Sequence, residues 1–364
     1  MSNTLFSSWT IRDLELKNRV VLPPMCQYAV DAEDGVVGQW HRVHYGARAA
    51  GGFGLVIAEA TAVVPEGRIS PRDAGIWNDE QVAAWSQVTD IIHAMGAKAG
   101  IQLGHAGRKA STYPMLPEQP NGTVPESESG WEPVAPSAIS FGEGFAVPRE
   151  LTTEEVAAIP QAFAAAARRA VDAGFDALEI HGAHGYLIHQ FLDPISNQRT
   201  DRYGENRQLL ALEVIEAIRA AVPEETPLIM RVSATDWLED DAHSWRVADT
   251  VELARAAKER GVDVMHVSTG GNVITDIPTG PGYQAPFARM VREEADIPTI
   301  AVGMITDPRL ASYLVSSETA DAVAVGRAAL YNPSWPQAAA NSLGIDVAAP
   351  SVARPKYYFR GTFR

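Results

Sequence analysis

Two histidines and a tyrosine stand close together in the chain, at His181, His184 and Tyr186. They follow the apolar run 177–180, so we predict that they lie at the carboxyl end of a buried strand. Two neutral imidazoles can both donate N–H bonds to one carbonyl or anionic oxygen, and a nearby phenol can deliver a proton. The His-x-x-His spacing also suits a metal ion, but no third ligand of defined spacing is evident nearby. The pattern therefore favours catalytic donors over a metal site.

Other predicted strands also end in polar, proline or glycine residues. These ends are Pro23-Pro24-Met25-Cys26-Gln27-Tyr28, Gln102-Leu103-Gly104-His105, Arg231-Val232-Ser233, Gly303 and Gly326-Arg327. Glycines with exposed backbone N–H groups beside an arginine predict a phosphate pocket at the last two ends. Taken together, the strand ends predict a phosphate-bearing cofactor that lies across them.

Short apolar runs alternate with amphipathic segments along the chain. The runs predict eight strands, at 19–25, 54–60, 97–103, 177–181, 228–232, 262–267, 299–302 and 321–325. The helices predicted between them include 79–95, 153–173, 206–221, 246–260 and 285–294. Strands that are apolar at consecutive positions are buried on both faces, as in a parallel sheet covered by helices. Eight such units predict an α/β fold, a (β/α)8 TIM barrel, over residues 1–364 as one domain; a doubly wound open sheet is the alternative.

Two segments depart from this alternation. Residues 112–145 are rich in Pro, Gly, Ser and Glu and are predicted to form a surface loop or a short hairpin inserted after the third strand. In a barrel this connection lies on the catalytic face, so it is either a substrate lid or a solvated excursion without function. A carboxyl-terminal tail is expected at about 345–364. Elsewhere, Thr152-Thr153-Glu154-Glu155 predicts a helix start, and Gly174 and Gly261 predict helix ends.

Composition and charge narrow the class of protein. The 364 residues are 46% hydrophobic, which is enough for a large core, and the formal net charge is −15. This charge argues against a nucleic-acid partner and against an anionic membrane surface. No signal-peptide pattern or membrane-spanning run is found, so we expect a soluble, cytoplasmic protein. The single cysteine, Cys26, excludes an internal disulfide and a cysteine-rich metal or iron–sulfur site within this chain.

The strand ends also discriminate between phosphate-bearing cofactors. No Gly-x-Gly-x-x-Gly follows a strand and opens a helix, which argues against a dinucleotide in a Rossmann crevice. Pyridoxal phosphate would need a lysine at a strand end, and Lys109 lies beyond the third strand in a loop. Flavin mononucleotide fits better, because Gln102 can bind the pyrimidine edge of its ring and Arg231 can offset negative charge there. Gly326 and Arg327 can then hold its phosphate.

Five blocks of the chain carry a resemblance to a known family. They are 24–28 (PMCQY), 102–109 (QLGHAGRK), 181–191 (HGAHGYLIHQF), 197–203 (NQRTDRY) and 324–327 (AVGR). In this order they resemble the Old Yellow Enzyme family of flavin-dependent ene-reductases, and in particular its thermophilic-like bacterial branch. The similarity extends from about Leu5 to the carboxyl terminus. One departure is the turn 203–207, which lacks the Gly-Gly-Ser element usual in the family.

The resemblance implies a ping-pong reaction in one site. NADPH would reduce a tightly but non-covalently bound FMN and leave, and an activated alkene, an unsaturated carbonyl or nitro compound, would take its place. His181 and His184 would hold the substrate oxygen, and Tyr186 would protonate the α-carbon. Fixed donors aimed at an oxygen that gains charge in the transition state lower the barrier by a few kcal/mol.

The resemblance also implies roles for further residues. Cys26 would tune the reduction potential of the flavin, and Tyr28 would contact the substrate. Arg360 would reach into a neighbouring active site of a homo-oligomer, either a dimer or a tetramer. The residues implied to bind the cofactor are Pro23, Pro24, Met25, Cys26, Ala60, Gln102, Arg231, Gly303, Gly326 and Arg327. Two other functions stay open: a metal-dependent barrel hydrolase that uses the histidine pair, and a flavin-binding protein without catalysis.

Overall fold

Eight parallel strands close into a barrel in the computed structural model, which describes residues 4–238, 243–346, 349–352 and 354–361. The strands follow one another around the barrel in chain order, and the last pairs with the first. They are β3 (Val20–Leu22), β4 (Leu55–Ala62), β5 (Lys98–Gly104), β8 (Ala177–Gly182), β9 (Leu228–Ser233), β10 (Val264–Ser268), β11 (Thr299–Ala301) and β12 (Ala322–Ala324). The predicted TIM barrel is therefore confirmed, and the open sheet is wrong.

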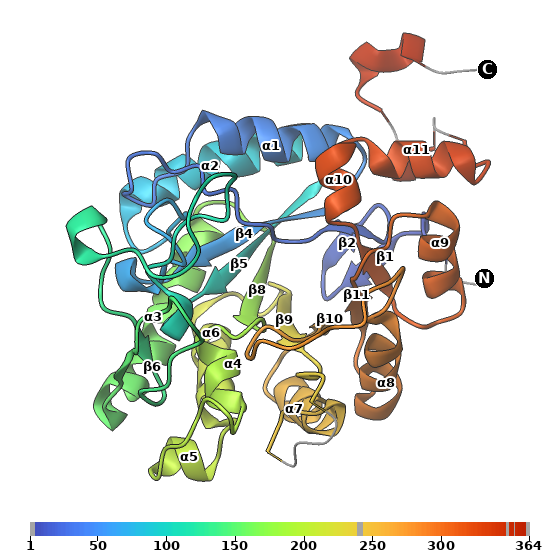
Figure 1. The fold of residues 1–364 in the computed structure, drawn as a ribbon. Helices are drawn as coiled ribbons and strands as arrows, with labels where there is room; N and C mark the ends of the chain where they lie inside the picture. Colours follow the sequence, from blue (N-terminus) through green and yellow to red (C-terminus); the bar gives the residue numbers. More distant parts are fainter. Residues whose placement is uncertain (1–3, 239–242, 347–348, 353, 362–364) are drawn as a thin grey trace.

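Helices surround this barrel, as Figure 1 shows. The longer ones are α1 (Gln39–Ala50), α2 (Asp79–Ala94), α3 (Thr153–Asp172), α6 (Leu209–Ala221), α7 (Val247–Glu259), α8 (Ala285–Ala295), α9 (Pro308–Ser316) and α11 (Trp335–Ser342). Three short helices, α4 (Leu187–Leu192), α5 (Arg202–Glu205) and α10 (Arg327–Tyr331), follow strand ends or connect longer helices. All residues of β8, β9 and β10 are buried, because the barrel interior covers one face of each strand and the helices cover the other.

The first barrel strand is shorter than predicted. The apolar pattern predicts a strand over 19–25, whereas β3 ends at Leu22. Pro23 and Pro24 follow it, and proline has no N–H group with which to continue the ladder of hydrogen bonds. The chain therefore leaves the barrel at this proline pair and runs over its carboxyl end.

A small hairpin that the sequence analysis did not predict covers the opposite end of the barrel. It consists of β1 (Trp9–Ile11) and β2 (Leu14–Leu16), paired antiparallel. Its apolar side chains pack against residues at the amino-terminal ends of the barrel strands, including Leu55 and Ile229. Strands of three residues are too short to give a clear alternation in the sequence. The hairpin thus closes the end of the barrel that does not carry the histidines.

The segment 112–145 is mostly irregular and packs over the carboxyl end of the barrel. It contains the 3-10 helix η3 (Glu126–Glu128) and the strand β6 (Val134–Ala135), which pairs in parallel with β7 (Arg149–Glu150). Trp131 donates its indole N–H to the carbonyl of Glu66 at 2.9 Å. The segment is therefore fixed to the loop that follows β4.

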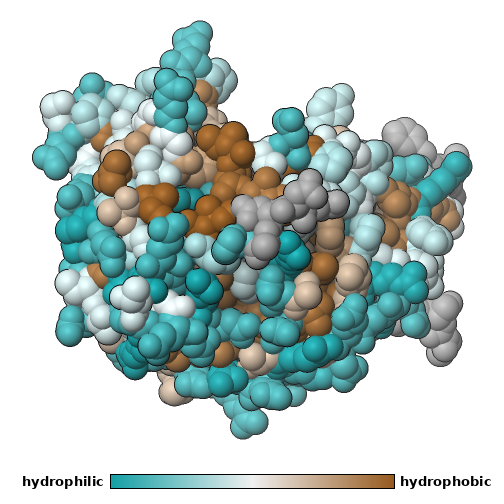
Figure 2. Space-filling view, turned by 60° about the horizontal axis from the view of Figure 1, so that its bottom comes forward, coloured by the Kyte–Doolittle hydropathy of each residue, from teal (hydrophilic) through white to brown (hydrophobic). Residues whose placement is uncertain are grey.

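The outer surface is largely hydrophilic on the face that Figure 2 presents, with hydrophobic side chains gathered in its upper part. Among the described residues, no helix combines the length and the apolar character that crossing a bilayer requires.

Helix α3 begins as the sequence predicts. Thr152 accepts a hydrogen bond from the backbone N–H of Glu155 at 3.2 Å, and Glu155 accepts one from the backbone N–H of Thr152 at 2.8 Å. This reciprocal pair is a capping box, which satisfies two N–H groups that the helix leaves without partners.

Thr152→Ala should lower the free energy of unfolding by about 1 kcal/mol, because the side-chain cap is lost while the helix keeps its packing. Urea denaturation followed by circular dichroism measures the effect. Thr152→Ser is the matched control, since serine keeps the capping hydroxyl. Equal destabilisation by both substitutions would contradict a capping role.

Candidate active site

His181, His184 and Tyr186 meet at the carboxyl end of β8. The ring centroids of the two histidines lie 5.2 Å apart with an interplanar angle of 87°, and those of His181 and Tyr186 lie 4.8 Å apart at 80°. The chain turns sharply here, with φ of +58° at His184 and +71° at Gly185. This turn brings the three rings together on one side of the strand end, as the sequence spacing predicts.

Both imidazoles are neutral near pH 7. Burial, reinforced by the positive charge of Arg231, holds the pKa of His181 and that of His184 well below the ordinary value for histidine. The Nδ1 atom of His181 accepts the backbone N–H of Ala183 at 3.3 Å, so the neutral ring carries its proton on Nε2. His181 also lines a small gap that it shares with Tyr186 and Ala60. Its Nε2–H is thus the group available as a donor.

Tyr186 keeps its proton. Burial, together with the negative charge of Asp73, raises the pKa of the Tyr186 phenol well above its ordinary value. A phenol that stays protonated can act as a proton donor to a strongly basic carbon or oxygen.

A buried carboxylate links three strands beside the histidines. Oε1 of Glu179 accepts a hydrogen bond from Nε2 of Gln102 at 2.7 Å. Its other oxygen, Oε2, lies 2.7 Å from Nδ1 of His266. Gln102 is on β5, Glu179 on β8 and His266 on β10, and all three are at most 2% exposed. We call these residues the Glu179 network. Glu179 and His266 have no distinct signal in the sequence, because both lie inside the apolar runs that predict β8 and β10.

Arg231 presents a buried charge with few partners. It is 8% exposed, its Nε is buried, and no hydrogen bond to its guanidinium is found among the described residues. Its backbone pairs in register with His181, so the guanidinium lies near the histidines and Glu179. A buried guanidinium without acceptors is costly, which marks this position as one where a ligand would supply them.

A cavity of about 290 Å³ opens next to this arginine. We call it the Arg231 cavity. Among the residues that line it are Pro23, Pro24, Met25, Arg231, Gly303, Gly326 and Arg327, all of which the sequence analysis assigned to a cofactor. Ala60 lies instead in the gap beside His181 and Tyr186. The Arg231 cavity also takes in Ser268, Tyr283 and Gln284, which no sequence motif indicated.

A larger cavity, of about 730 Å³, lies at the other end of the barrel. Lys98, the first residue of β5, and Asp176, just before β8, contribute to it. Active sites of this fold lie at the carboxyl ends of the strands. We therefore place the site at the smaller Arg231 cavity, which the strand-end glycines line and whose Ser268 contacts His184.

Cys26 and Tyr28 lie close to each other in the loop that follows β3. Tyr28 is 8% exposed and has φ of +51°, an uncommon conformation for a tyrosine. Burial and the nearby carboxylates of Asp73 and Glu59 raise the pKa of the Cys26 thiol well above its ordinary value. Cys26 and Tyr186 also pack against the same small apolar cluster, around Ile69.

Arg360 is not brought to this site. It lies in the 3-10 segment η5 (Lys356–Gly361) and is exposed. Figure 1 shows this segment apart from the barrel, beyond α11.

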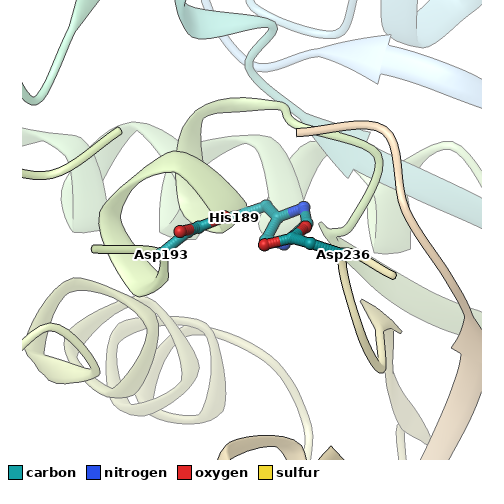
Figure 3. A group of neighbouring side chains, drawn as sticks. All are labelled: His189, Asp193 and Asp236. Atoms are coloured by element: carbon teal, nitrogen blue, oxygen red, sulfur yellow. The ribbon is translucent and has the colours of Figure 1, made fainter. Parts of the chain in front are cut away.

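A third histidine, His189 on α4, lies close to Asp193 and Asp236, as Figure 3 shows. Their ligand atoms are within 4.8 Å of one another, the only such group of three or more metal-ligand side chains in the described ranges. However, Nδ1 of His189 accepts the backbone N–H of Gly185 at 2.9 Å, so the neutral ring carries its proton on Nε2, the atom that faces Asp236. A ring in this tautomer has no lone pair to offer a metal there.

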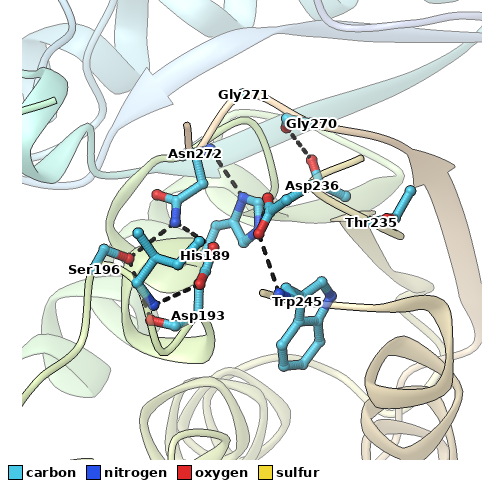
Figure 4. Close-up of polar contacts among 12 residues, drawn as sticks. His189, Asp193, Ser196, Thr235, Asp236, Trp245, Gly270, Gly271 and Asn272 are labelled. Atoms are coloured by element: carbon cyan, nitrogen blue, oxygen red, sulfur yellow. Dashed lines mark hydrogen bonds and ion pairs between the residues drawn. The ribbon is translucent and has the colours of Figure 1, made fainter. Parts of the chain in front are cut away.

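The same three residues instead form part of a polar network, drawn in Figure 4. Burial and the adjoining carboxylate of Asp193 raise the pKa of Asp236 well above its ordinary value. Asn272 donates to Asp193 and to Ser196. Arg108 donates to the carbonyl of Asn272 at 2.6 Å. This network fixes α4 to the loops that follow β9 and β10.

Comparison with known proteins decides the family. The model of the NADH:flavin oxidoreductase / NADH oxidase family matches residues 4–345. The chain belongs to this family. It includes the Old Yellow Enzymes, so the resemblance seen in the sequence is confirmed.

Relatives in this flavin oxidoreductase family match almost the whole chain. The NADPH dehydrogenase of Geobacillus thermodenitrificans is 46% identical over 353 residues, which are 96% of this chain and 97% of the relative. That of Listeria innocua is 47% identical over 350 residues, 95% of this chain and 97% of the relative.

Solved structures of the family agree with the fold. Morphinone reductase has a TM-score of 0.78 at 29% identity and covers 100% of this chain and 99% of its own. The Old Yellow Enzyme homologue of Zymomonas mobilis has a TM-score of 0.77 at 27% identity, with 97% and 98% covered. The chain is therefore an oxidoreductase with the barrel typical of the family.

The raised pKa of Cys26 predicts a slow reaction with iodoacetamide. At about pH 8 the thiol should react at least about tenfold more slowly than free N-acetylcysteine, because only the thiolate attacks. Cys26 is the only cysteine, so mass spectrometry of the intact protein measures this rate directly. A rate equal to that of the free thiol would contradict the environment described for Cys26.

Proposed function

We propose that this protein is an FMN-dependent ene-reductase. It oxidises NADPH and reduces the activated C=C bond of α,β-unsaturated carbonyl or nitro compounds. The observation that carries the proposal is the pair of neutral imidazoles, His181 and His184, beside the buried and unpartnered guanidinium of Arg231. The choice of NADPH rests on the relatives that are NADPH dehydrogenases.

The residues present fit FMN. Arg231 offers a buried positive charge without acceptors, and Gln102, held by Glu179, lies on β5, which is separated from the strand of Arg231 only by β8. Gly303, Gly326 and the exposed Arg327 also line the Arg231 cavity and would hold a phosphate. When bound, FMN would supply the carrier that takes a hydride from the nicotinamide and gives it to the alkene.

The histidines would act on the substrate oxygen. In the addition of a hydride to the β-carbon, negative charge gathers on the carbonyl or nitro oxygen. His181 and His184 would each donate an N–H to that oxygen, and both are held by the turn after β8 before any substrate arrives. Donors that are already in place stabilise the charge without the cost of reorganisation.

Tyr186 would complete the reaction by giving a proton to the α-carbon. Its phenol stays protonated, and its ring is in contact with that of His181. We assign Tyr28 to contact with the substrate and Cys26 to tuning of the flavin, since both lie in the loop after β3 and Cys26 packs in the same apolar cluster as Tyr186.

Two expectations from the sequence stay predictions. Arg360 lies in a segment apart from the barrel, a position suited to reaching a neighbouring subunit, and we assign it to the site of a partner in a homodimer or homotetramer. The cytoplasmic location also stays a prediction.

The proposal is favoured over the metal-dependent hydrolase. In the part of the chain that the structure describes, His181 and His184 do not belong to any group of three metal-ligand side chains. The Nε2 atom of His184 instead lies 2.8 Å from the hydroxyl oxygen of Ser268. The remaining rival, a flavoprotein without catalysis, would bind FMN but would not reduce alkenes.

A half-reaction under anaerobic conditions distinguishes these functions. Flavin that has been reduced with NADPH should be reoxidised when 2-cyclohexenone is added, and stopped-flow absorbance follows the change. His181→Ala and His184→Ala should each slow this step about 100-fold, the loss typical of one oxyanion donor, while flavin content stays unchanged. His93→Ala is the matched control, because His93 pairs with Asp176 at the opposite end of the barrel. Reoxidation of both variants at the parental rate would overturn the proposed roles.

Arg231→Met should weaken FMN binding by about ten- to a hundred-fold, since a hydrogen bond to a charged group contributes about 1.5–3 kcal/mol. Fluorescence titration of the flavin-free protein with FMN measures the dissociation constant. Arg289→Met, which removes an exposed arginine from α8, should leave it unchanged. Equal affinities of the two variants would contradict the assignment of Arg231 to the cofactor.

A further inference from the structure

His184 is held by residues at the ends of two neighbouring strands. Its backbone N–H donates to Oγ of Ser233 at 3.0 Å, and its Nε2 lies 2.8 Å from Oγ of Ser268. Ser233 ends β9 and Ser268 ends β10, and the two serines are partners in the register of the sheet. The backbone and the ring of His184 are therefore fixed by adjacent strand ends.

Lys109 restrains the same residue from the other side. Its Nζ donates to the carbonyl of His184 at 2.9 Å and to that of Gly271 at 3.0 Å. These contacts stabilise the left-handed backbone conformation of His184, which is uncommon for a residue with a side chain. With the backbone restrained on both sides, the ring depends on Ser268 for its orientation and its protonation site.

The hydrogen bonds around Ser268 determine which atom donates. A serine hydroxyl has one proton to give. The two acceptors near Oγ are Nε2 of His184 at 2.8 Å and Oε1 of Gln284 at 3.4 Å. Oε1 of Gln284 already receives the hydroxyl of Thr269 at 2.8 Å. If Nε2 of His184 carried the proton, the Ser268 hydroxyl could donate only along the longer contact, to an oxygen that already has a donor. We therefore assign the Ser268 proton to the shorter contact, with Nε2 of His184 as its acceptor.

A neutral imidazole that accepts at Nε2 carries its proton on Nδ1. His181 shows the opposite arrangement, because its Nδ1 accepts the N–H of Ala183 and its proton is on Nε2. The two rings are nearly perpendicular. Two perpendicular rings can both direct an N–H group at one oxygen, His181 through Nε2 and His184 through Nδ1.

We propose that Ser268 is a positioning residue that holds His184 in the Nδ1–H tautomer, so that His184 offers a donor to the substrate oxygen. The part of this inference that concerns the substrate rests on the proposed function. The tautomer itself does not, because it follows from contacts within the protein. Without the hydroxyl, the Nε2–H tautomer becomes accessible and its Nδ1 can no longer donate.

Nitrogen NMR of the holoenzyme, labelled with 15N-histidine, tests the tautomer directly. The two ring nitrogens of a neutral histidine differ strongly in chemical shift according to which one is protonated, and the spectrum of His184→Gln identifies the signals of His184. In the parent protein Nδ1 of His184 should be protonated, whereas Ser268→Ala should move the ring toward the Nε2–H form. Ser268→Thr keeps the hydroxyl and should retain the parental tautomer. Protonation of Nε2 in the parent, or an unchanged tautomer in Ser268→Ala, would overturn the inference.

A second measurement connects the tautomer with binding. Titration of the flavin absorbance with p-hydroxybenzaldehyde should give a dissociation constant about tenfold higher for Ser268→Ala, which is the loss of about one hydrogen bond. Ser316→Ala, which removes an exposed serine on α9, is the matched control. An unchanged constant in Ser268→Ala would overturn the role of Ser268 in donor positioning. A protein that binds this phenol yet reduces no alkene would contradict the proposed function and leave the NMR result intact.

Discussion

The buried carboxylate of Glu179 is the interaction on which the rest of the site depends. It is 1% exposed and holds Gln102 and His266 by hydrogen bonds of 2.7 Å. It also supplies the negative charge that faces Arg231. A buried charge is tolerated only where partners compensate for its lost hydration. Glu179 therefore fixes the relative positions of polar side chains on three strands. The guanidinium of Arg231, which faces its charge without a hydrogen bond among the described residues, keeps donors for a ligand.

Burial, reinforced by the positive charge of Arg231, accounts for the neutral state of His181 and His184. When one ring nitrogen of a neutral imidazole accepts a hydrogen bond, the other nitrogen carries the proton and is the donor. The hydrogen bonds of Ala183 and Ser268 select that nitrogen in each ring. The site can thus offer two directed donors to an oxygen that gains charge, without adding a second full positive charge beside Arg231.

The barrel and the histidine turn could be predicted from sequence because their signals are local. Consecutive apolar residues indicate strands buried on both faces, and His181, His184 and Tyr186 stand directly after one of them. Glu179 and His266 could not be found in this way, since an inward-facing charged residue is explained only by a partner on another strand. Ser268 has no signal in the sequence either, because its contact with His184 joins residues 84 positions apart. The short hairpin β1–β2 was missed because three-residue strands show too little periodicity.

A crystal structure of the purified protein with its cofactor tests the central claim most directly. We predict that the ring system of FMN lies against Gln102 and Arg231, with its phosphate at Gly326 and Arg327 and the rings of His181 and His184 facing it. A hydrogen-bond acceptor of the cofactor should bind the guanidinium of Arg231, whose Nε is buried without a partner. Cofactor bound elsewhere, or Arg231 bonded only to protein groups in the presence of FMN, would contradict it.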